Sequence, residues 1–97
     1  MYFITCFDST SEFGGPDDSR TFGFFSDPAT CKTALNENWC DMRECCYDYA
    51  VVERIEEGIH PRAEEICWYK WNNELQGFYE ITKRPEWAES WCNFALG

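Results

Sequence analysis

Six carboxylates gather on one predicted strand and in the loop after it, and these residues have the clearest potential for chemistry. They are Asp48, Glu53, Glu56, Glu57, Glu64 and Glu65. The chain carries 18 Asp and Glu residues against 8 Lys and Arg residues, a formal net charge of −10. Spaced carboxylates on a folded surface can imitate the phosphates of a duplex and occupy a basic channel in another protein. A solvated acidic rim without a partner is the alternative interpretation.

The net charge also limits the partners that the chain can have. A charge of −10 repels the phosphates of nucleic acids and of anionic membranes. We therefore predict a basic protein partner, no direct binding of nucleic acid and no membrane partner. No apolar run is long enough to span a bilayer, and residues 1–10 do not read as a signal peptide. We expect a cytoplasmic protein. The sequence does not determine its oligomeric state and is compatible with a homodimer.

Cysteine and histidine are the residues that could form a nucleophilic or metal site. The chain has 7 cysteines, which show no CxxC pair and no spacing typical of a metal site, and 1 histidine. His60 lies beside Pro61 in a predicted loop, and no catalytic motif surrounds it. We predict free, mostly buried thiols, no catalytic residue, no metal and no cofactor. A zinc site that joins His60 to Cys40, Cys45 or Cys46 is the alternative.

Aromatic side chains are concentrated in a predicted hairpin in the second half of the chain. They are Trp68, Tyr69, Trp71, Phe78 and Tyr79. Some of these rings must be core, and any that are exposed would form a recognition patch for a partner or a stacked base. This patch, with Arg20 or Arg54, supports an alternative function as a binding protein for a small ligand or a nucleotide signal.

One helix, at residues 28–40, is expected to organise the fold. Asp27 followed by Pro28 is a strong helix start, since Asp27 can cap the first turn and Pro28 has a helical φ. The apolar residues that follow recur at four, four and three positions and form one stripe. They are Cys31, Leu35, Trp39 and Met42. Such a stripe needs an apolar sheet as its partner.

The remaining segments favour strands, loops and one short helix. Strands are predicted at 2–7, 20–25, 47–55, 66–71 and 78–82, with a short helix at 85–91. Residues 92–96 are predicted either to form a last edge strand, which we favour, or to extend that helix. Loops are predicted at 8–19, 56–65 and 72–77. Gly23 indicates a bulge or a close approach by a neighbour, and Ala50 with Val52 should lie under the helix. The sum is a single α+β domain over residues 1–97, with a mostly antiparallel sheet of five to six strands and the main helix on one face.

Several short motifs carry a resemblance to a known family. RTFGFF at 20–25, CDM at 40–42, YDYAVVE at 47–53, GIHP at 58–61, WYKW at 68–71 and FYEI at 78–81 resemble a small family carried by Firmicute genomes and their phages. The motifs are structural, so the resemblance implies a fold and transfers no active site. It also implies a mobile-element context, in which compact acidic proteins inhibit host defence nucleases. We therefore expect a non-enzymatic inhibitor that binds the basic surface of a CRISPR-type nuclease. The high cysteine count departs from this pattern.

Overall fold

The computed structural model describes residues 1–8, 18–89 and 93–96. The strands are β1 (Tyr2–Phe7), β2 (Ser19–Phe25), β3 (Tyr49–Ile55), β4 (Ala63–Asn72) and β5 (Gly77–Ile81). The helices are α1 (Pro28–Asn36) and the two 3-10 helices η1 (Trp39–Asp41) and η2 (Glu86–Ala88). No helix in the described ranges has the length and apolarity that a bilayer crossing requires.

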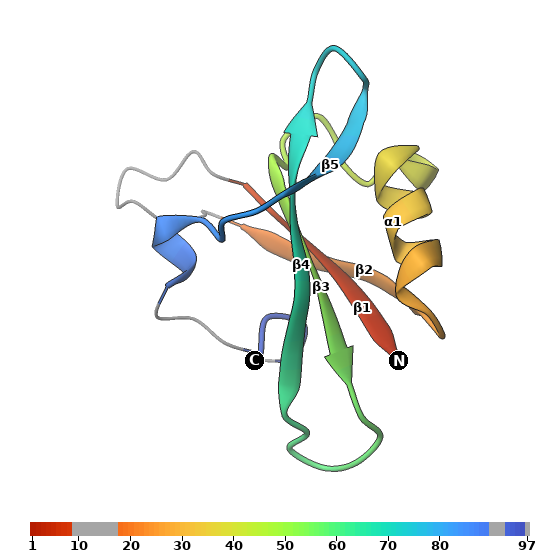
Figure 1. The fold of residues 1–97 in the computed structure, drawn as a ribbon, viewed down its shortest axis with the longest axis vertical. Coiled ribbons are helices and arrows are strands. Elements are labelled where there is room, and N and C mark those ends of the chain that lie inside the picture. The colour runs from red at the N-terminus through yellow and green to blue at the C-terminus, as the bar shows by residue number, and fades with distance from the viewer. Residues whose placement is uncertain (9–17, 90–92, 97) are drawn as a thin grey trace.

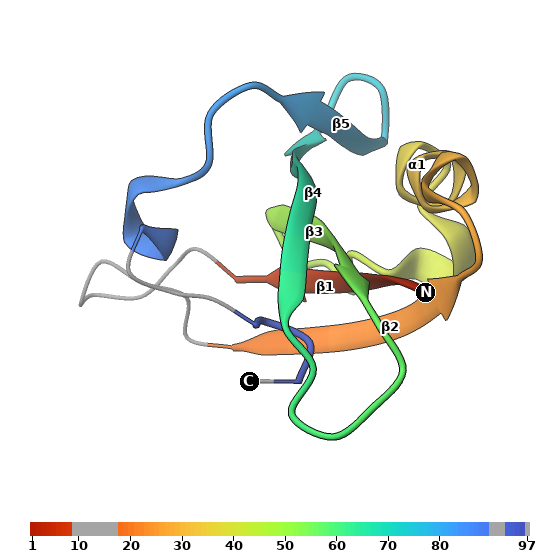
Figure 2. The ribbon, with the colours of Figure 1, turned by 60° about the horizontal axis from the view of Figure 1, so that its bottom comes forward.

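The five strands form one sheet in the order β2-β1-β3-β4-β5, and every neighbouring pair is antiparallel. Figures 1 and 2 show α1 on one side of this twisted sheet and η2 with the C-terminal residues on the other. The predicted α+β fold, with a mostly antiparallel sheet and one main helix on one face, is therefore confirmed.

The face of the sheet toward α1 holds the larger core. Its buried residues include Ile4, Cys6, Ala50, Val52, Tyr69 and Phe78 from the strands, and Cys31, Ala34 and Leu35 from α1. Because side chains alternate along a strand, Ala50 and Val52 both point to this face. Their predicted place under the helix is confirmed, and their small size leaves room for the helix to approach.

The opposite face carries a second core that the C-terminal residues cover. Phe7, Val51, Trp68 and Ala88 are buried there, with Trp87 and Phe94 packed against them. The ring of Phe94 lies 5.3 Å from that of Phe7 and 5.2 Å from that of Trp68, edge-on in both contacts. Both faces of this short sheet are thus covered, which compensates for the small core of a chain this size.

The start of α1 follows the prediction, and its end does not. The carboxylate of Asp27 accepts hydrogen bonds from the Thr30 backbone N–H and hydroxyl, both at 2.9 Å, and Pro28 occupies the first turn. The helix ends at Asn36 rather than near residue 40, because Asn38 and Cys40 have φ of 50° and 55°. This left-handed backbone cannot continue a right-handed helix. Trp39 therefore leaves the apolar stripe and is 39% exposed.

Three other predicted segments need correction or fall partly outside the described residues. β4 begins at Ala63 instead of residue 66, and the described part of the short helix predicted at 85–91 holds only the 3-10 turn η2. Residues 93–96, predicted as an edge strand with residue 92, form a turn. Residues 9–17 of the predicted loop and residues 90–92 lie outside the described ranges.

Gly77 ties the β4–β5 hairpin to the end of α1. A Cβ atom at this position would lie 2.0 Å from the backbone oxygen of Asn36, which is far inside van der Waals contact. Only glycine allows this approach of the two backbones. The contact fixes the end of α1 against β5, and so helps to place η1 beside the sheet.

Candidate functional site

Glu53, one of the six carboxylates predicted to bind a partner, lies in the interior. Its exposure is 0%, and its two carboxylate oxygens accept hydrogen bonds from the backbone N–H groups of Phe94 (2.8 Å) and Ala95 (2.9 Å). Burial, with a smaller effect of Glu65, raises the pKa of Glu53, and the two hydrogen bonds lower it in part. The assignment of Glu53 to a partner surface is wrong, because this carboxylate holds the C-terminal residues on the sheet.

Four of the other five carboxylates lie beside guanidinium groups. Arg54 reaches Glu56 at 3.0 Å and Glu64 at 3.7 Å. Arg84 lies 2.9 Å from Glu65, which also accepts a hydrogen bond from the Trp68 indole at 3.1 Å. Asp48 lies 4.0 Å from Arg43, and Glu57 is exposed. The predicted acidic cluster is therefore largely compensated within the protein itself.

The predicted aromatic patch is divided between the two faces of the sheet. Trp68 is buried in the core under the C-terminal residues, whereas Tyr69 and Phe78 are buried in the core under α1. Trp71 is half-buried and lies under the guanidinium of Arg43, 4.6 Å from the ring centre. Tyr79 is half-buried. These rings form no common platform for a base, because neighbours along a strand point to opposite faces.

A hollow of about 350 Å³ lies where β4 and β5 separate, and its polar groups are unsuited to phosphate or to nucleophilic catalysis. Glu65, Glu80 and Arg84 line it. The guanidinium of Arg84 forms an ion pair with Glu65 and is therefore already neutralised. The thiol of Cys67 donates to Glu80 at 3.0 Å, and burial together with this carboxylate raises the pKa of Cys67 to about 11. A thiol in that state is a poor nucleophile.

The other sulfur and imidazole groups form no metal site among the described residues. Cys6 and Cys31 are buried, and burial raises the pKa of Cys31 to about 11. The prediction of mostly buried thiols is wrong at the turn after α1, where three cysteines are exposed: Cys40, Cys45 and Cys46. The side chain of His60 is exposed in the β3–β4 loop.

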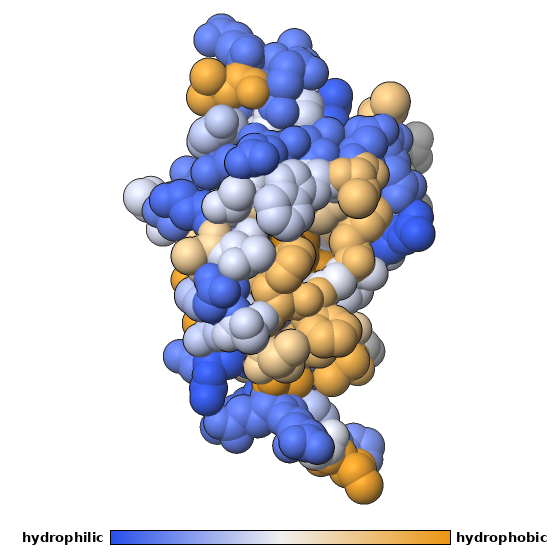
Figure 3. All heavy atoms as spheres, turned by 90° about the vertical axis from the view of Figure 1, so that its right-hand side faces the viewer, coloured by the Kyte–Doolittle hydropathy of each residue, from blue (hydrophilic) through white to orange (hydrophobic). Residues whose placement is uncertain are grey.

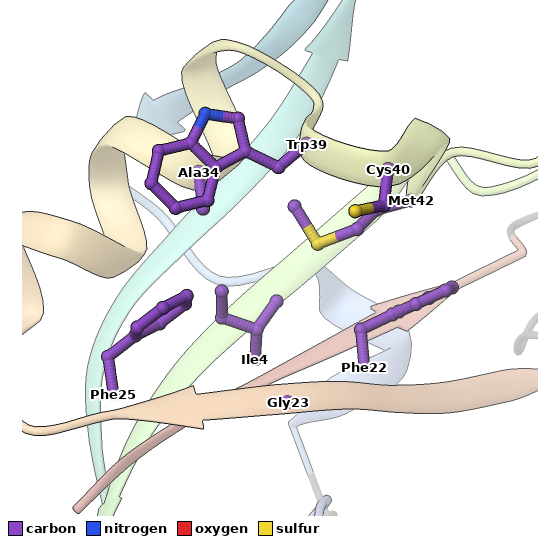
Figure 4. Close-up of a pocket in the computed structure, with 8 residues that line it drawn as sticks. All are labelled: Ile4, Phe22, Gly23, Phe25, Ala34, Trp39, Cys40 and Met42. Atoms are coloured by element: carbon purple, nitrogen blue, oxygen red, sulfur yellow. The ribbon is translucent and has the colours of Figure 1, made fainter.

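An apolar hollow beside Gly23 is the feature that sequence reasoning missed. The β1–β2 register shifts between Ile4 and Thr5, so that Phe22 is an extra residue between Thr21 and Gly23. The predicted bulge is confirmed. Figure 4 shows Phe22 and Phe25 rising from β2 on either side of Gly23. Since glycine has no side chain, the space between the two rings stays open.

The walls of the hollow come from both layers of the fold. Ile4, Phe22, Gly23 and Phe25 form the sheet side, and Ala34, Trp39, Cys40 and Met42 close it from α1 and η1 (Figure 4). The volume of the hollow is about 150 Å³. An apolar cavity of that size takes a molecule like benzene, whereas pockets for drug-sized ligands are larger, about 300–1,000 Å³. The hollow therefore suits a single apolar side chain.

Four carboxylates, which we call the rim carboxylates, connect to residues of this hollow: Asp18, Asp27, Glu37 and Asp41. Each accepts a hydrogen bond from a neutral donor. Asp18 bonds the hydroxyl of Tyr47, whose ring lies edge-on to Phe22. Asp27 accepts from the backbone N–H of Thr30. Glu37 accepts from the indole N–H of Trp39 at 3.1 Å, and Asp41 accepts from the side-chain amide of Asn38 at 3.2 Å. Within the described residues, no ion pair joins these four to Lys or Arg.

Neutral donors leave the negative charge of the rim carboxylates in place. The hydrogen bonds from Thr30 hold the pKa of Asp27 below its usual range, so this carboxylate stays ionised. Burial and then the bond to Asp18 raise the pKa of Tyr47 to about 12, and Glu44 adds to the effect. Figure 3, coloured by hydropathy, shows apolar side chains gathered in a patch on the α1 side, with hydrophilic residues along its border.

The arrangement combines an apolar hollow with uncompensated negative charge around it. Gly23 between aromatic residues was a signal for the bulge, but the outward turn of Trp39 is a tertiary feature that no local pattern indicates. No family model, no curated protein and no solved structure matches the chain.

Proposed function

We propose that the protein is a non-enzymatic inhibitor that docks on a basic surface of a partner protein. The single observation that carries the proposal is the set of rim carboxylates, which keep their charge because their partners are neutral donors. Fixed carboxylates attract a basic surface and steer its approach. Such a surface is what proteins use to bind nucleic acid, so docking would exclude the natural ligand.

The kind of partner follows from the resemblance to proteins of Firmicute genomes and phages. That context favours a CRISPR-type nuclease, whose nucleic-acid channel is basic. The alternative of a small-ligand or nucleotide-signal binder receives no support from the rings, which are packed on two faces of the sheet. Arg20 and Arg54, which would have to hold a phosphate, are paired with Glu44 and with Glu56 and Glu64.

The test measures binding to a panel of guide-loaded CRISPR nucleases and inhibition of their DNA cleavage. We expect at least one nuclease to bind, with an affinity that falls roughly tenfold or more between about 0.05 M and 0.5 M salt, because salt screens exposed charges. Binding that stays equally strong at the higher salt would contradict the electrostatic proposal.

A pair of charge reversals tests which carboxylates carry the docking. Glu37→Lys with Asp41→Lys should abolish inhibition, since both positions belong to the rim. Glu57→Lys with Glu74→Lys changes the net charge equally at exposed positions outside the rim, and should leave most of the inhibition. Equal losses in the two variants would show that net charge alone, rather than this surface, decides binding.

A further inference from the structure

The hollow beside Gly23 is lined by apolar residues, so charge attraction alone does not explain what would bind in it. We propose that it receives one apolar side chain of the partner, from an extended segment in which Lys or Arg residues flank that side chain. This inference rests on the proposed function, because it names the part of the basic partner that the rim carboxylates hold.

The size and lining of the hollow select the central residue of that segment. About 150 Å³ accommodates a side chain such as Leu, Ile, Met or Phe. Rings of Phe22, Phe25 and Trp39 and the thioether of Met42 line it, so a polar side chain would lose its hydrogen bonds to water there. A well-packed apolar anchor of this kind, ringed by groups that exclude water, is the usual form of a binding hot spot.

The charges around the hollow select the flanking residues. Glu37 bonds the Trp39 ring that closes one wall, and Asp41 lies between the lining residues Cys40 and Met42. Asp27 follows Phe25 by two positions and caps α1. Because Asp27 lies at the start of α1 and Glu37 and Asp41 lie beyond its end, cations on the two sides of the anchor can each meet a negative partner.

A second copy of this chain is a poor occupant on the same grounds. Each chain has a formal net charge of −10, and pairing the two hollows would bring two sets of rim carboxylates together. Like charges placed opposite each other in an interface weaken it. The proposal therefore commits to a segment of a basic partner protein.

The experiment titrates the ¹⁵N-labelled protein with three capped pentapeptides and follows its amide resonances. The peptides are Lys-Lys-Leu-Lys-Lys, the same with Gly at the centre, and Glu-Glu-Leu-Glu-Glu. We expect the first to shift the amides of Gly23 and Phe25 and the indole N–H of Trp39. It should bind roughly tenfold more tightly than the Gly peptide, in line with loss of a hot-spot anchor, and the acidic peptide should not bind.

Filling the hollow gives the matched test. A Cβ at Gly23 meets nothing within 4 Å, and the backbone there is not in the left-handed region, so Gly23→Val can fold and block the site. It should remove the preference for Leu over Gly, whereas Ser19→Val, on the same strand outside the hollow, should keep it. If Gly23→Val does not fold by circular dichroism, Trp39→Ala, which removes one wall, takes its place with the same expected loss.

The outcomes separate this inference from the proposed function. Equal binding of the Leu and Gly peptides, or a Leu preference that survives Gly23→Val, would overturn the anchor and leave electrostatic docking intact. Binding of the acidic peptide as tight as that of the basic one would contradict the proposed function itself. A dimer in sedimentation that Gly23→Val dissociates would assign the hollow to a second copy and overturn the proposal.

Discussion

Two groups of carboxylates in this molecule have opposite surroundings. The first, on β3, β4 and the loop between them, comprises Glu53, Glu56, Glu64 and Glu65, and we call it the β3–β4 group. Glu53 is fully buried against backbone N–H groups, and the other three lie beside guanidinium groups. The rim carboxylates accept only from neutral donors in the hydrogen bonds described above. Of these two groups, it is the rim carboxylates that present uncompensated charge to a partner.

The difference shows that the density of charge along the sequence does not locate a charged surface. The β3–β4 group is denser in sequence, and it serves the protein's own structure. Charge that is offset by Arg84, partly offset by Arg54, or buried as in Glu53 exerts a weaker field outside. The rim carboxylates are scattered in sequence from residue 18 to residue 41, and the fold links them to the hollow indirectly: Glu37 bonds the indole of the lining residue Trp39, and Asp18 bonds Tyr47, whose ring contacts Phe22.

The largest expected effect is the loss of stability when Glu53 is truncated. Glu53→Ala leaves two backbone N–H groups without their acceptor and opens a cavity, so we expect a loss of about 2–4 kcal/mol in the free energy of unfolding. Urea denaturation at neutral pH measures it. Glu57→Ala, exposed in the adjacent loop, is the control and should stay within about 0.5 kcal/mol. Equal effects of the two variants would show that Glu53 has no special structural role.

Glu53 should also give the stability a pH dependence opposite in sign to that of Asp27, because the pKa of Glu53 is raised in the folded protein and that of Asp27 is lowered. Its folded-state pKa is raised from the ordinary value of 4.5, so the folded chain keeps a proton that the unfolded chain releases. The stabilisation is complete below about pH 4.5 and is lost as the pH rises through the folded-state pKa. Glu53→Gln does not titrate. The wild-type stability minus that of Glu53→Gln should fall with rising pH, and a rise would mean that the two N–H bonds dominate.

Asp27 sharpens the comparison, because it is a rim carboxylate that also has a structural task. Asp27→Ala removes the cap from the first turn of α1 and should lower the midpoint of thermal unfolding. Asp27→Asn should restore most of that stability while removing the charge. We therefore expect Asp27→Asn to fold like the wild type in thermal unfolding and to bind a basic partner more weakly; unchanged binding would remove Asp27 from the docking surface.

Truncation of Arg54 should give the smallest change in stability. It should also remove the positive charge that lies beside Glu56 and Glu64 in the β3–β4 group. The ion pairs of Arg54 with Glu56 and Glu64 are exposed, so Arg54→Ala should alter the free energy of unfolding by about 0–1 kcal/mol. The variant should nevertheless leave both carboxylates uncompensated and create a second negative surface. Binding of a trivalent cation at these residues, absent in the wild type, would confirm it; no new binding would show that Arg54 does not neutralise them.

The sequence was informative where the cause of structure is local. Asp27 with Pro28 predicted the start of α1, the β-rich run from Tyr2 to Phe7 predicted β1, and Gly23 predicted the bulge. In each case the residues act on their own backbone or on immediate neighbours. The small residues Ala50 and Val52 were placed correctly because strand alternation carries that information.

The sequence was misleading where a distant group decides the outcome. Residues 93–96 do not form a strand, because the N–H groups of Phe94 and Ala95 donate to the carboxylate of Glu53 instead of to a neighbouring strand. Glu53 lies about forty positions earlier in the chain, so no local sequence pattern indicates this contact. The rim carboxylates were not identified as a group, since the donors to Glu37 and Asp41 and the outward turn of Trp39 depend on the left-handed backbone after α1, and the donor to Asp18 is the distant Tyr47.

The most direct test of the account maps the negative surface without any partner. Hexaamminecobalt(III), a compact trivalent cation, is titrated into the ¹⁵N-labelled wild-type protein at low salt, where surface charges are least screened. The account predicts that the amides next to Asp18, Asp27, Glu37 and Asp41 shift first and saturate together. Shifts that begin instead at Glu56, Glu57 and Glu64 would contradict it.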